Sequence, residues 1–423
     1  MTDSSASRRR FLQTSGALLL GAAGLHSRLA QAQQDVDTLF AVADDDSYWQ
    51  SVRQQFAFRE DAVPMNAANL CPSFQPVAQH VSAMTADIDQ DCSFNNRAKF
   101  SGFLEDTRSR VAAQLKVSVD EVALVRNTSE ANNIINNGLS LERGEEVIIW
   151  DENHPTNHVA WQVRAARYGF SVKAVPTPAD VNVENLVSAF VNQFSDRTRV
   201  LALTHVSNVS GIKLPVAELV AAAHARGIFV HLDGAQTWGA MDLDLRTLGV
   251  DAYTASAHKW YMGPKEVGLL YVREPVQTRI WPGVVASGWG DGAETRQRGA
   301  RKFESLGQRD DAALAALGLT ARIHDHIGAS RIEQRIVALS QRLKSGVQAL
   351  GIPLVTPSDA SLSFGVCIVA VPDGQAGALA NRLYAEYGIA GAGTGGLRLC
   401  PGIYNTEAHV DRAIDGIRAL LQA

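Results

Sequence analysis

Residues 254–264 read Thr254-Ala255-Ser256-Ala257-His258-Lys259-Trp260-Tyr261-Met262-Gly263-Pro264. Lys259 follows a short apolar run and precedes a Gly-Pro turn, which predicts that it stands just beyond the end of a buried strand. A lysine in a water-poor pocket beside a bound cation loses proton affinity and becomes a nucleophile that can form a Schiff base. Ser256 and His258 can donate hydrogen bonds to a phosphate. A single lysine of this kind is more often a surface residue, so its interpretation depends on the segments around it.

Upstream, the run His231-Leu232-Asp233-Gly234-Ala235-Gln236 ends a second predicted strand. Asp233 stands where the tip of a strand meets the ligand crevice of an α/β sheet. A carboxylate there can pair with the protonated pyridine nitrogen of pyridoxal 5'-phosphate (PLP) and keep the ring an electron sink. A lone aspartate could equally cap the next turn. One strand ending in Asp, followed by another ending in Ser-x-His-Lys, favours the cofactor.

Short apolar runs alternate with helical stretches from about residue 120 to residue 275. The pattern predicts strands at Glu146–Trp150, Arg199–Thr204, Ile228–Leu232 and Val267–Val272, and a helix at Pro215–Arg226. Such alternation predicts an α/β fold with a mainly parallel sheet sandwiched by helices, and ligand groups at the carboxyl ends of the strands.

After about residue 310 the pattern changes to longer helical stretches. Helices are predicted at Asp311–His324, Ile332–Leu350 and Glu407–Gln422, with strands near 363–371. We therefore expect a large cofactor-binding domain at 76–309, a smaller α+β domain at 310–423, and a segment at 33–75 that packs on the smaller domain.

The first 32 residues are interpreted as an export signal. Arg8-Arg9-Arg10 precedes the apolar stretch 16–25, and Ala30-Gln31-Ala32 supplies a small-x-small cleavage site. The stretch is far shorter than the ~20 residues that span a bilayer. We expect twin-arginine export to the periplasm, no stable membrane anchor, and a route that suits an enzyme loaded with cofactor before export.

The composition excludes some classes of function. A net charge of -5 and 20% charged residues argue against a nucleic-acid partner. Four dispersed cysteines lack the paired spacing of a zinc site, and disulfides are permitted but not required.

The two motifs resemble the class V aminotransferase superfamily of PLP enzymes, which has the type I fold, and the isopenicillin N epimerase-like branch in particular. The resemblance runs from about Asn66 to Asn405. It implies that Lys259 forms the Schiff base with PLP and that Asp233 is the partner of the pyridine nitrogen. Gln236 then donates to the phenolic oxygen of the ring, and the side chains that bind the phosphate are Ser256 and His258.

Further segments take family roles by the same likeness. Thr128 and Ser129 match the first phosphate loop at a helix start, where a capping box is also compatible with the sequence. His154 matches the histidine that stacks on the ring, although His154 and His158 also have H-x3-H metal spacing, which Pro155 disfavours.

The residues that match family positions near the substrate lie farther apart in the chain. Asn208 matches an asparagine that contacts the ring oxygen or the substrate, and Asn66 and Asn157 are assigned to the substrate. Arg398 matches the arginine that clamps the substrate carboxylate in two-point fashion.

The sequence departs from the family pattern at two places, and these departures bear on the reaction and on the contact between subunits. Cysteine desulfurases carry a nucleophilic cysteine shortly before this arginine, but no cysteine lies between Cys367 and Arg398. Gln308 stands where family members often have a threonine that reaches the cofactor of the neighbouring subunit in a homodimer.

The sequence therefore predicts a homodimeric PLP enzyme, with no metal, acting at the α-carbon of a small amino-acid substrate by aminotransfer or epimerisation. A β-eliminating C–S lyase remains the alternative, and a non-catalytic binding protein on the same fold is a third reading. A nicotinamide oxidoreductase would need a glycine-rich turn after the first strand, whereas residues 393–396 lie near the C-terminus.

Overall fold

The computed structural model describes residues 36, 45–285 and 299–422. The expected signal peptide at 1–32 lies outside these residues. Contacts divide the chain into two compact units, Met1–Val52 and Arg53–Ala423, and all the strands belong to the second. In the described part of the chain, no helix has both the length and the apolar character needed to cross a membrane.

A seven-stranded sheet is the centre of the second unit, with strand order β2-β8-β7-β6-β5-β3-β4. Neighbouring strands are parallel except where β8 pairs antiparallel with β2 and β7. The predicted mainly parallel sheet is therefore confirmed. In chain order the strands are β2 (Val122–Val125), β3 (Glu146–Trp150), β4 (Ser171–Val175), β5 (Thr198–Thr204), β6 (Phe229–Asp233), β7 (Ala252–Ser256) and β8 (Gly268–Val272).

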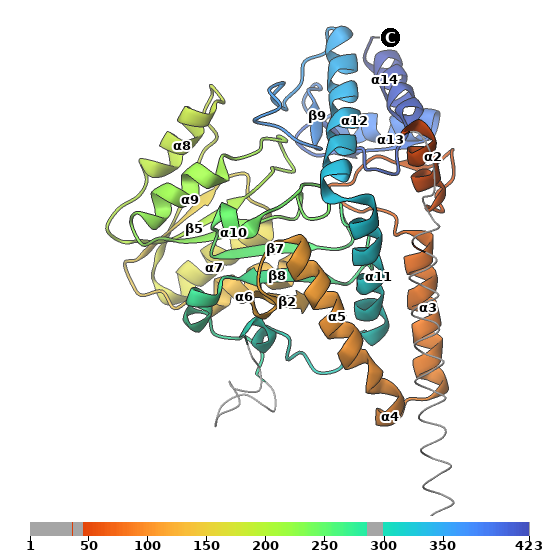
Figure 1. Ribbon diagram of the computed structural model, residues 1–423. Coiled ribbons are helices and arrows are strands. Elements are labelled where there is room, and N and C mark those ends of the chain that lie inside the picture. Colours follow the sequence, from red (N-terminus) through yellow and green to blue (C-terminus); the bar gives the residue numbers. More distant parts are fainter. Residues whose placement is uncertain (1–35, 37–44, 286–298, 423) are drawn as a thin grey trace, which may run out of the picture. The chain divides into compact units, whose positions relative to one another are not determined.

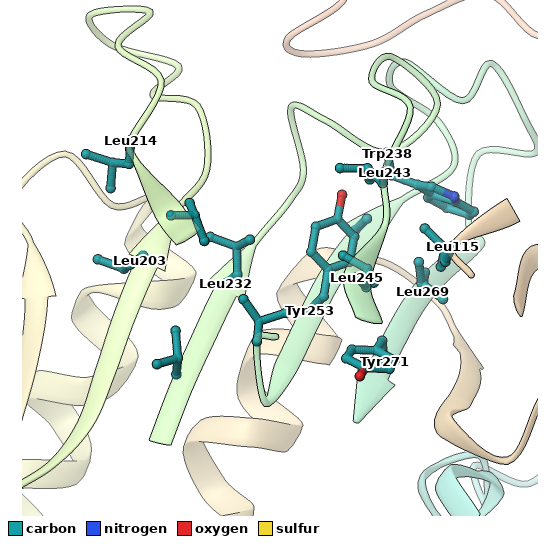
Figure 2. Close-up of a cluster of buried hydrophobic side chains, with 14 of the residues drawn as sticks. Leu115, Leu203, Leu214, Leu232, Trp238, Leu243, Leu245, Tyr253, Leu269 and Tyr271 are labelled. Carbon is teal, nitrogen blue, oxygen red and sulfur yellow. The ribbon is translucent and has the colours of Figure 1, made fainter. Parts of the chain in front are cut away.

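Alternate side chains of these strands enter two different apolar clusters, one on each face of the sheet. One face carries Leu203, Leu232, Tyr253, Leu269 and Tyr271, which lie on neighbouring strands in Figure 2. The opposite face carries Ala202, Phe229, Ala252, Leu270 and Val272. Both clusters are buried, which is why these strands read as continuous apolar runs rather than alternating ones.

Helices cover both faces. Those that pack on the first face are α5 (Lys99–Gln114), α8 (Val183–Val191), α9 (Val216–His224), α10 (Leu245–Leu248) and α11 (Asp311–Ile327). The second face is covered by α6 (Thr128–Gly138) and α7 (Val159–Tyr168). The orange α5 and the teal α11 lie along one another (Figure 1).

A separate apolar cluster forms around the C-terminal elements. Its antiparallel sheet has the order β11-β12-β9, and β10 pairs in parallel with β1 near the start of the unit. The elements are β1 (Val63–Pro64), α12 (Ala329–Ala349), β9 (Cys367–Val369), α13 (Ala376–Tyr387), β10 (Ile389–Ala390), β11 (Ala392–Gly393), β12 (Leu397–Leu399) and α14 (Glu407–Gln422). The predicted domain boundaries near residues 76 and 310 stay predictions.

The remaining elements are short or connect the larger ones. They are α2 (Asp45–Gln54), α3 (Gln75–Gln90), α4 (Phe94–Arg97), and the 3-10 turns η1 (Val119–Glu121), η2 (Pro155–Asn157), η3 (Glu274–Arg279) and η5 (Gly299–Phe303).

Candidate active site

A pocket of about 240 Å³ lies at the carboxyl edge of the seven-stranded sheet. Nine of the residues predicted from the sequence line it: Thr128, Ser129, His154, Asn208, Asp233, Gln236, Ser256, His258 and Lys259. They come from segments spread over more than a hundred residues of sequence. The parallel topology brings them together because the carboxyl ends of β2, β3, β5, β6 and β7 share one edge.

Asp233 is the last residue of β6 and is buried. The next residue must be small, because a Cβ on Gly234 would stand 1.9 Å from the ring of Tyr253 on β7. The Asp233 carboxylate is held from two sides: Ala235 N donates to Oδ1 at 3.0 Å, and Asn132 Nδ2 donates to Oδ2 at 2.9 Å. The carboxylate therefore has a fixed orientation at the floor of the pocket.

The start of α6 forms one end of the pocket. The Asn127 side chain caps the helix by accepting from Glu130 N at 3.0 Å. Thr128 N donates to Ser256 Oγ at 2.7 Å, and the Thr128 and Ser256 hydroxyls lie 2.6 Å apart. The positive end of the helix and these hydroxyls favour an anion at this place.

His258 also lines the pocket. Burial, together with the Lys259 and Lys265 charges, lowers the pKa of His258 to about 4. The imidazole is therefore neutral near pH 7, where it can contribute a single N–H to an anion.

Lys259 follows β7 and lines the pocket beside Asp233. Burial is the main cause that lowers the pKa of Lys259, the Asp233 carboxylate opposes that effect, and the Arg398 cation adds to it. A lysine with a lowered pKa carries more free amine near neutral pH than an ordinary lysine and is correspondingly more nucleophilic.

His154 is exposed, lines the pocket and caps the short turn η2. Its Nδ1 lies 3.1 Å from the Thr156 hydroxyl and accepts from Thr156 N at 3.4 Å. Partial burial of the ring is the main cause that lowers the pKa of His154. The Asp233 charge opposes this shift, and the Lys259 charge lowers the pKa further. The ring is therefore neutral near pH 7.

Arg398 on β12 is buried next to the pocket rather than in its wall. Its Nε donates to Asn66 Oδ1 at 3.2 Å, and its Nη1 donates to the Asn208 carbonyl at 2.9 Å. These contacts bring together three residues that the sequence assigned to substrate or cofactor binding. The guanidinium has five N–H donors, so these two bonds leave donors for a carboxylate.

Gln236 has one amide orientation because two neighbours bind it. Trp260 Nε1 donates to Gln236 Oε1 at 2.8 Å, and Gln236 Nε2 donates to the Ala68 carbonyl at 3.1 Å. An amide nitrogen carries two protons, so one N–H remains for the pocket that Gln236 lines. The predicted bond to a ring oxygen stays a prediction.

Two predicted residues lie elsewhere. Asn157 is fully buried, accepts from Trp161 Nε1 at 3.1 Å and donates to the Leu203 carbonyl, so its side chain joins α7 to β5 instead of facing a substrate. Gln308 is exposed and accepts from Arg97 Nη2 at 2.8 Å. Neither residue lines the pocket of its own chain. The expected contact of Gln308 with the cofactor of a neighbouring subunit stays a prediction.

Several pocket residues were not singled out from the sequence: Asn69, Asn127, Thr156, Thr204 and Ala235. Behind the pocket wall, Asn132 was also missed although it contacts Asp233. Asn127 precedes Thr128, Asn132 follows Ser129 by three residues, and Thr156 follows His154 by two, so their closeness in the sequence to predicted site residues was the available signal. Which side chain of a motif points inward becomes clear only from the fold.

The arrangement fits PLP by the chemistry of its donors. The pocket offers hydroxyls, an imidazole and a helix N-terminus for a phosphate. It also offers the Asp233 carboxylate for a protonated ring nitrogen, together with the Lys259 amine. No group of three or more His, Cys, Asp or Glu side chains in the described part of the chain could hold a metal ion.

Comparison with known proteins gives one family. Residues 81–412 match the model of the family described as aminotransferase class-V. The chain is similar to isopenicillin N epimerase of Streptomyces clavuligerus, with 28% identity over 400 residues, 90% of this chain and 99% of that protein. It is also 29% identical over 343 residues to a cysteine desulfurase of Escherichia coli O8 (strain IAI1), covering 75% of this chain and 82% of that one.

Among solved structures, a C-DES variant with glycine covalently linked to its PLP cofactor has a TM-score of 0.79. The identity is 23%, and the match covers 86% of this chain and 98% of that chain. A likeness at this identity concerns the fold alone, and it confirms the predicted one.

Proposed function

Since the chain belongs to the class V aminotransferase family, we propose that it is a PLP enzyme that acts at the α-carbon of an amino-acid substrate by aminotransfer or epimerisation. PLP is the cofactor of this family, in agreement with the cofactor expected from the sequence. The observation that carries the proposal is the single pocket that holds the Lys259 amine, the Asp233 carboxylate and the anion-binding start of α6. The epimerase-like relative, which spans nearly the whole of both chains, supports the choice of reaction.

When bound, PLP supplies an electron-poor ring that stabilises negative charge at the substrate α-carbon. Thr128, Ser129, Ser256 and His258 would hold its phosphate, and Lys259 would be its point of covalent attachment. The Asp233 carboxylate would pair with the ring nitrogen and favour its protonated form, because a nearby negative charge favours the cationic form of its partner.

The free Lys259 amine would act as the base that takes a proton from the substrate α-carbon. Burial and the Arg398 cation both lower the pKa of Lys259, so the amine is poised to accept a proton at a lower pH than an ordinary lysine. Arg398, held by Asn66 and by the Asn208 carbonyl, orients the substrate carboxylate and thereby the bond to be broken.

A PLP-dependent C–S lyase that eliminates at the β-carbon is the alternative, and the cysteine desulfurase relative favours it. A persulfide mechanism has less support, because no cysteine is among the described residues that line the pocket. The cysteines Cys71, Cys367 and Cys400 are buried, and burial raises the pKa of Cys71 and of Cys367 to about 12. Thiols of that kind are poor nucleophiles at neutral pH.

The experiment that separates these reactions incubates the purified holoenzyme with a panel of amino acids in heavy water. The proposal predicts deuterium at the α-carbon, with either inverted configuration or a keto acid and the pyridoxamine form of the cofactor, and a Lys259→Ala variant should show none of these. Pyruvate and ammonia from a sulfur-containing amino acid would favour the lyase instead. Loaded enzyme that exchanges no α-proton with any amino acid would contradict the proposal.

We also propose that the mature chain is a periplasmic homodimer exported by the twin-arginine route. The paired arginines and the cleavage site at residues 30–32 support export, and the family resemblance supports the dimer. The N-terminal mass of the protein from fractionated cells and its sedimentation mass check the two statements.

A further inference from the structure

Asn132 is a fully buried polar residue of α6 that the proposed reaction does not yet use. It lies on the face of the sheet that α6 covers, which is also the face that carries alternate residues of β6 and β7. Asp233 on β6 and Thr254 on β7 point to that face, and both bind the Asn132 amide. A buried amide in the middle of a helix needs such partners, because without them it would lose the hydrogen bonds that it makes to water in the unfolded chain.

All hydrogen-bonding groups of the Asn132 amide are in use. Nδ2 donates to Asp233 Oδ2 at 2.9 Å and to the Thr156 hydroxyl at 3.1 Å, while Oδ1 accepts from the Thr254 hydroxyl at 2.6 Å. A carboxylate oxygen only accepts, so Nδ2 must face Asp233, and Oδ1 must then accept from the Thr254 hydroxyl.

The hydrogen bonds of Asn132 extend through Thr156 to His154. The Thr156 hydroxyl accepts from Asn132 and can donate its one proton to His154 Nδ1, 3.1 Å away. The backbone N–H of Thr156 also points at Nδ1, at 3.4 Å. Nδ1 is thus an acceptor, and the proton of the neutral imidazole is on Nε2.

On the other side of Asn132, the hydrogen bonds run through Thr254 and end at His231, which is neutral. Thr254 gives its proton to Asn132, so it can only accept from His231 Nε2, which lies 3.5 Å away. His231 Nδ1 has no hydrogen-bond partner in the part of the chain that the structure describes, and burial lowers the pKa of His231 to about 3. Asp233 is therefore the single charged member of the group formed by His154, Thr156, Asn132, Asp233, Thr254 and His231.

We infer that Asn132 is a positioning residue that holds the Asp233 carboxylate and, through Thr156, sets the tautomer of His154. This inference rests on the proposed function, in which Asp233 and His154 both act on the PLP ring. One side chain then fixes the two groups together, so that neither needs to reorient when the cofactor ring changes its charge.

The test compares Asn132→Leu with Asn136→Leu. Asn136 is the matched control, because it is equally buried one turn later on α6 and donates to the Thr156 carbonyl, but has no bond to Asp233. Histidine-selective ¹⁵N NMR of the apo-protein, with the signal assigned from a His154→Gln variant, reports the tautomer without any activity. The release of PLP from the loaded protein is the second readout.

Wild type and Asn136→Leu should show His154 with its proton on Nε2, and Asn132→Leu should show mixed tautomers. Asn132→Leu should also release PLP about tenfold faster or more, because a hydrogen bond to a charged group contributes roughly 1.5–3 kcal/mol. Should Asn132→Leu not fold, Thr156→Val removes the link to His154 while leaving Asn132 on Asp233. That variant should lower the fraction of His154 that carries its proton on Nε2.

Two results would overturn the inference: an unchanged His154 signal in Asn132→Leu or Thr156→Val, or release of PLP from Asn132→Leu at the rate of Asn136→Leu. Failure of the proposed function is distinct from these, since wild-type protein would then fail to attach PLP at Lys259, whereas the apo-protein NMR result does not depend on PLP.

Discussion

Lys259 and Arg398 interact through their charges, and this interaction makes the strongest prediction at the scale of single residues. The Arg398 cation lowers the pKa of Lys259, as burial does. Removing the cation in Arg398→Leu should stabilise the protonated amine and raise the pKa of Lys259. The rate at which apo-protein attaches PLP depends on free amine and rises with pH through that pKa, so the midpoint of the rate profile should move to higher pH.

Arg398→Lys is the matched control for this prediction, because it keeps a positive charge near the amine. Its midpoint should stay close to that of wild type. A midpoint that is the same in Arg398→Leu and wild type, measured by the absorbance of the attached cofactor, would mean that Arg398 is not electrostatically coupled to Lys259.

Residue types and spacing were sufficient to predict most of the pocket, and the exceptions have physical reasons. Asp233 and Ser256 end strands whose apolar runs are plain in the sequence, and Lys259 comes three residues after Ser256, so the edge of the sheet at which they lie could be predicted. Asn157 also comes after a strand, yet its side-chain Oδ1 accepts a hydrogen bond from the indole of Trp161 one helical turn later. Such a local hydrogen bond decides where the side chain points, and the spacing of residues in the sequence does not reveal it.

At the scale of elements, the start of α6 is the part of the pocket that can be tested most cleanly. Asn127 caps α6, and Asn182 caps α8 (Val183–Val191) in the same way, by accepting from Asn185 N at 2.8 Å. Replacing either asparagine with alanine should lower the free energy of unfolding by about 1 kcal/mol. Only Asn127→Ala should also weaken PLP binding, roughly threefold to tenfold, because only α6 begins at the pocket.

Chemical denaturation measures the first effect, and a PLP titration of apo-protein measures the second. Equal PLP affinity in Asn127→Ala and Asn182→Ala, with both caps lost, would show that the phosphate does not bind at the start of α6.

The long elements were predictable and the short ones were not. β3 and α14 have the predicted bounds, and α11 and α12 differ from prediction by a few residues at their ends. β10, β11 and β12 are two or three residues long, too short for a periodic pattern, and their pairing depends on tertiary contacts. The antiparallel direction of β8 also lacks a local signal, because buried strands of either direction read as apolar runs.

At the scale of the whole molecule, the strand topology brings the residues of the site together. Residues of the pocket range from Asn69 to Lys259, and Arg398 reaches it from a sheet formed by the last part of the chain. The sequence could predict that strand ends converge, because parallel strands share their carboxyl edge. It could not predict which side of α6 faces β6, and so the contact between Asn132 and Asp233 required the folded structure.

Covalent attachment of PLP to Lys259 is the claim on which every role above depends, and one measurement tests it directly. Protein purified from PLP-supplemented cells is reduced with borohydride, digested, and its peptides are weighed by mass spectrometry. The account predicts a pyridoxyl group on the peptide that contains Lys259, and its loss in Lys259→Ala. A pyridoxyl group on another lysine, or on none in a folded wild-type protein, would contradict it.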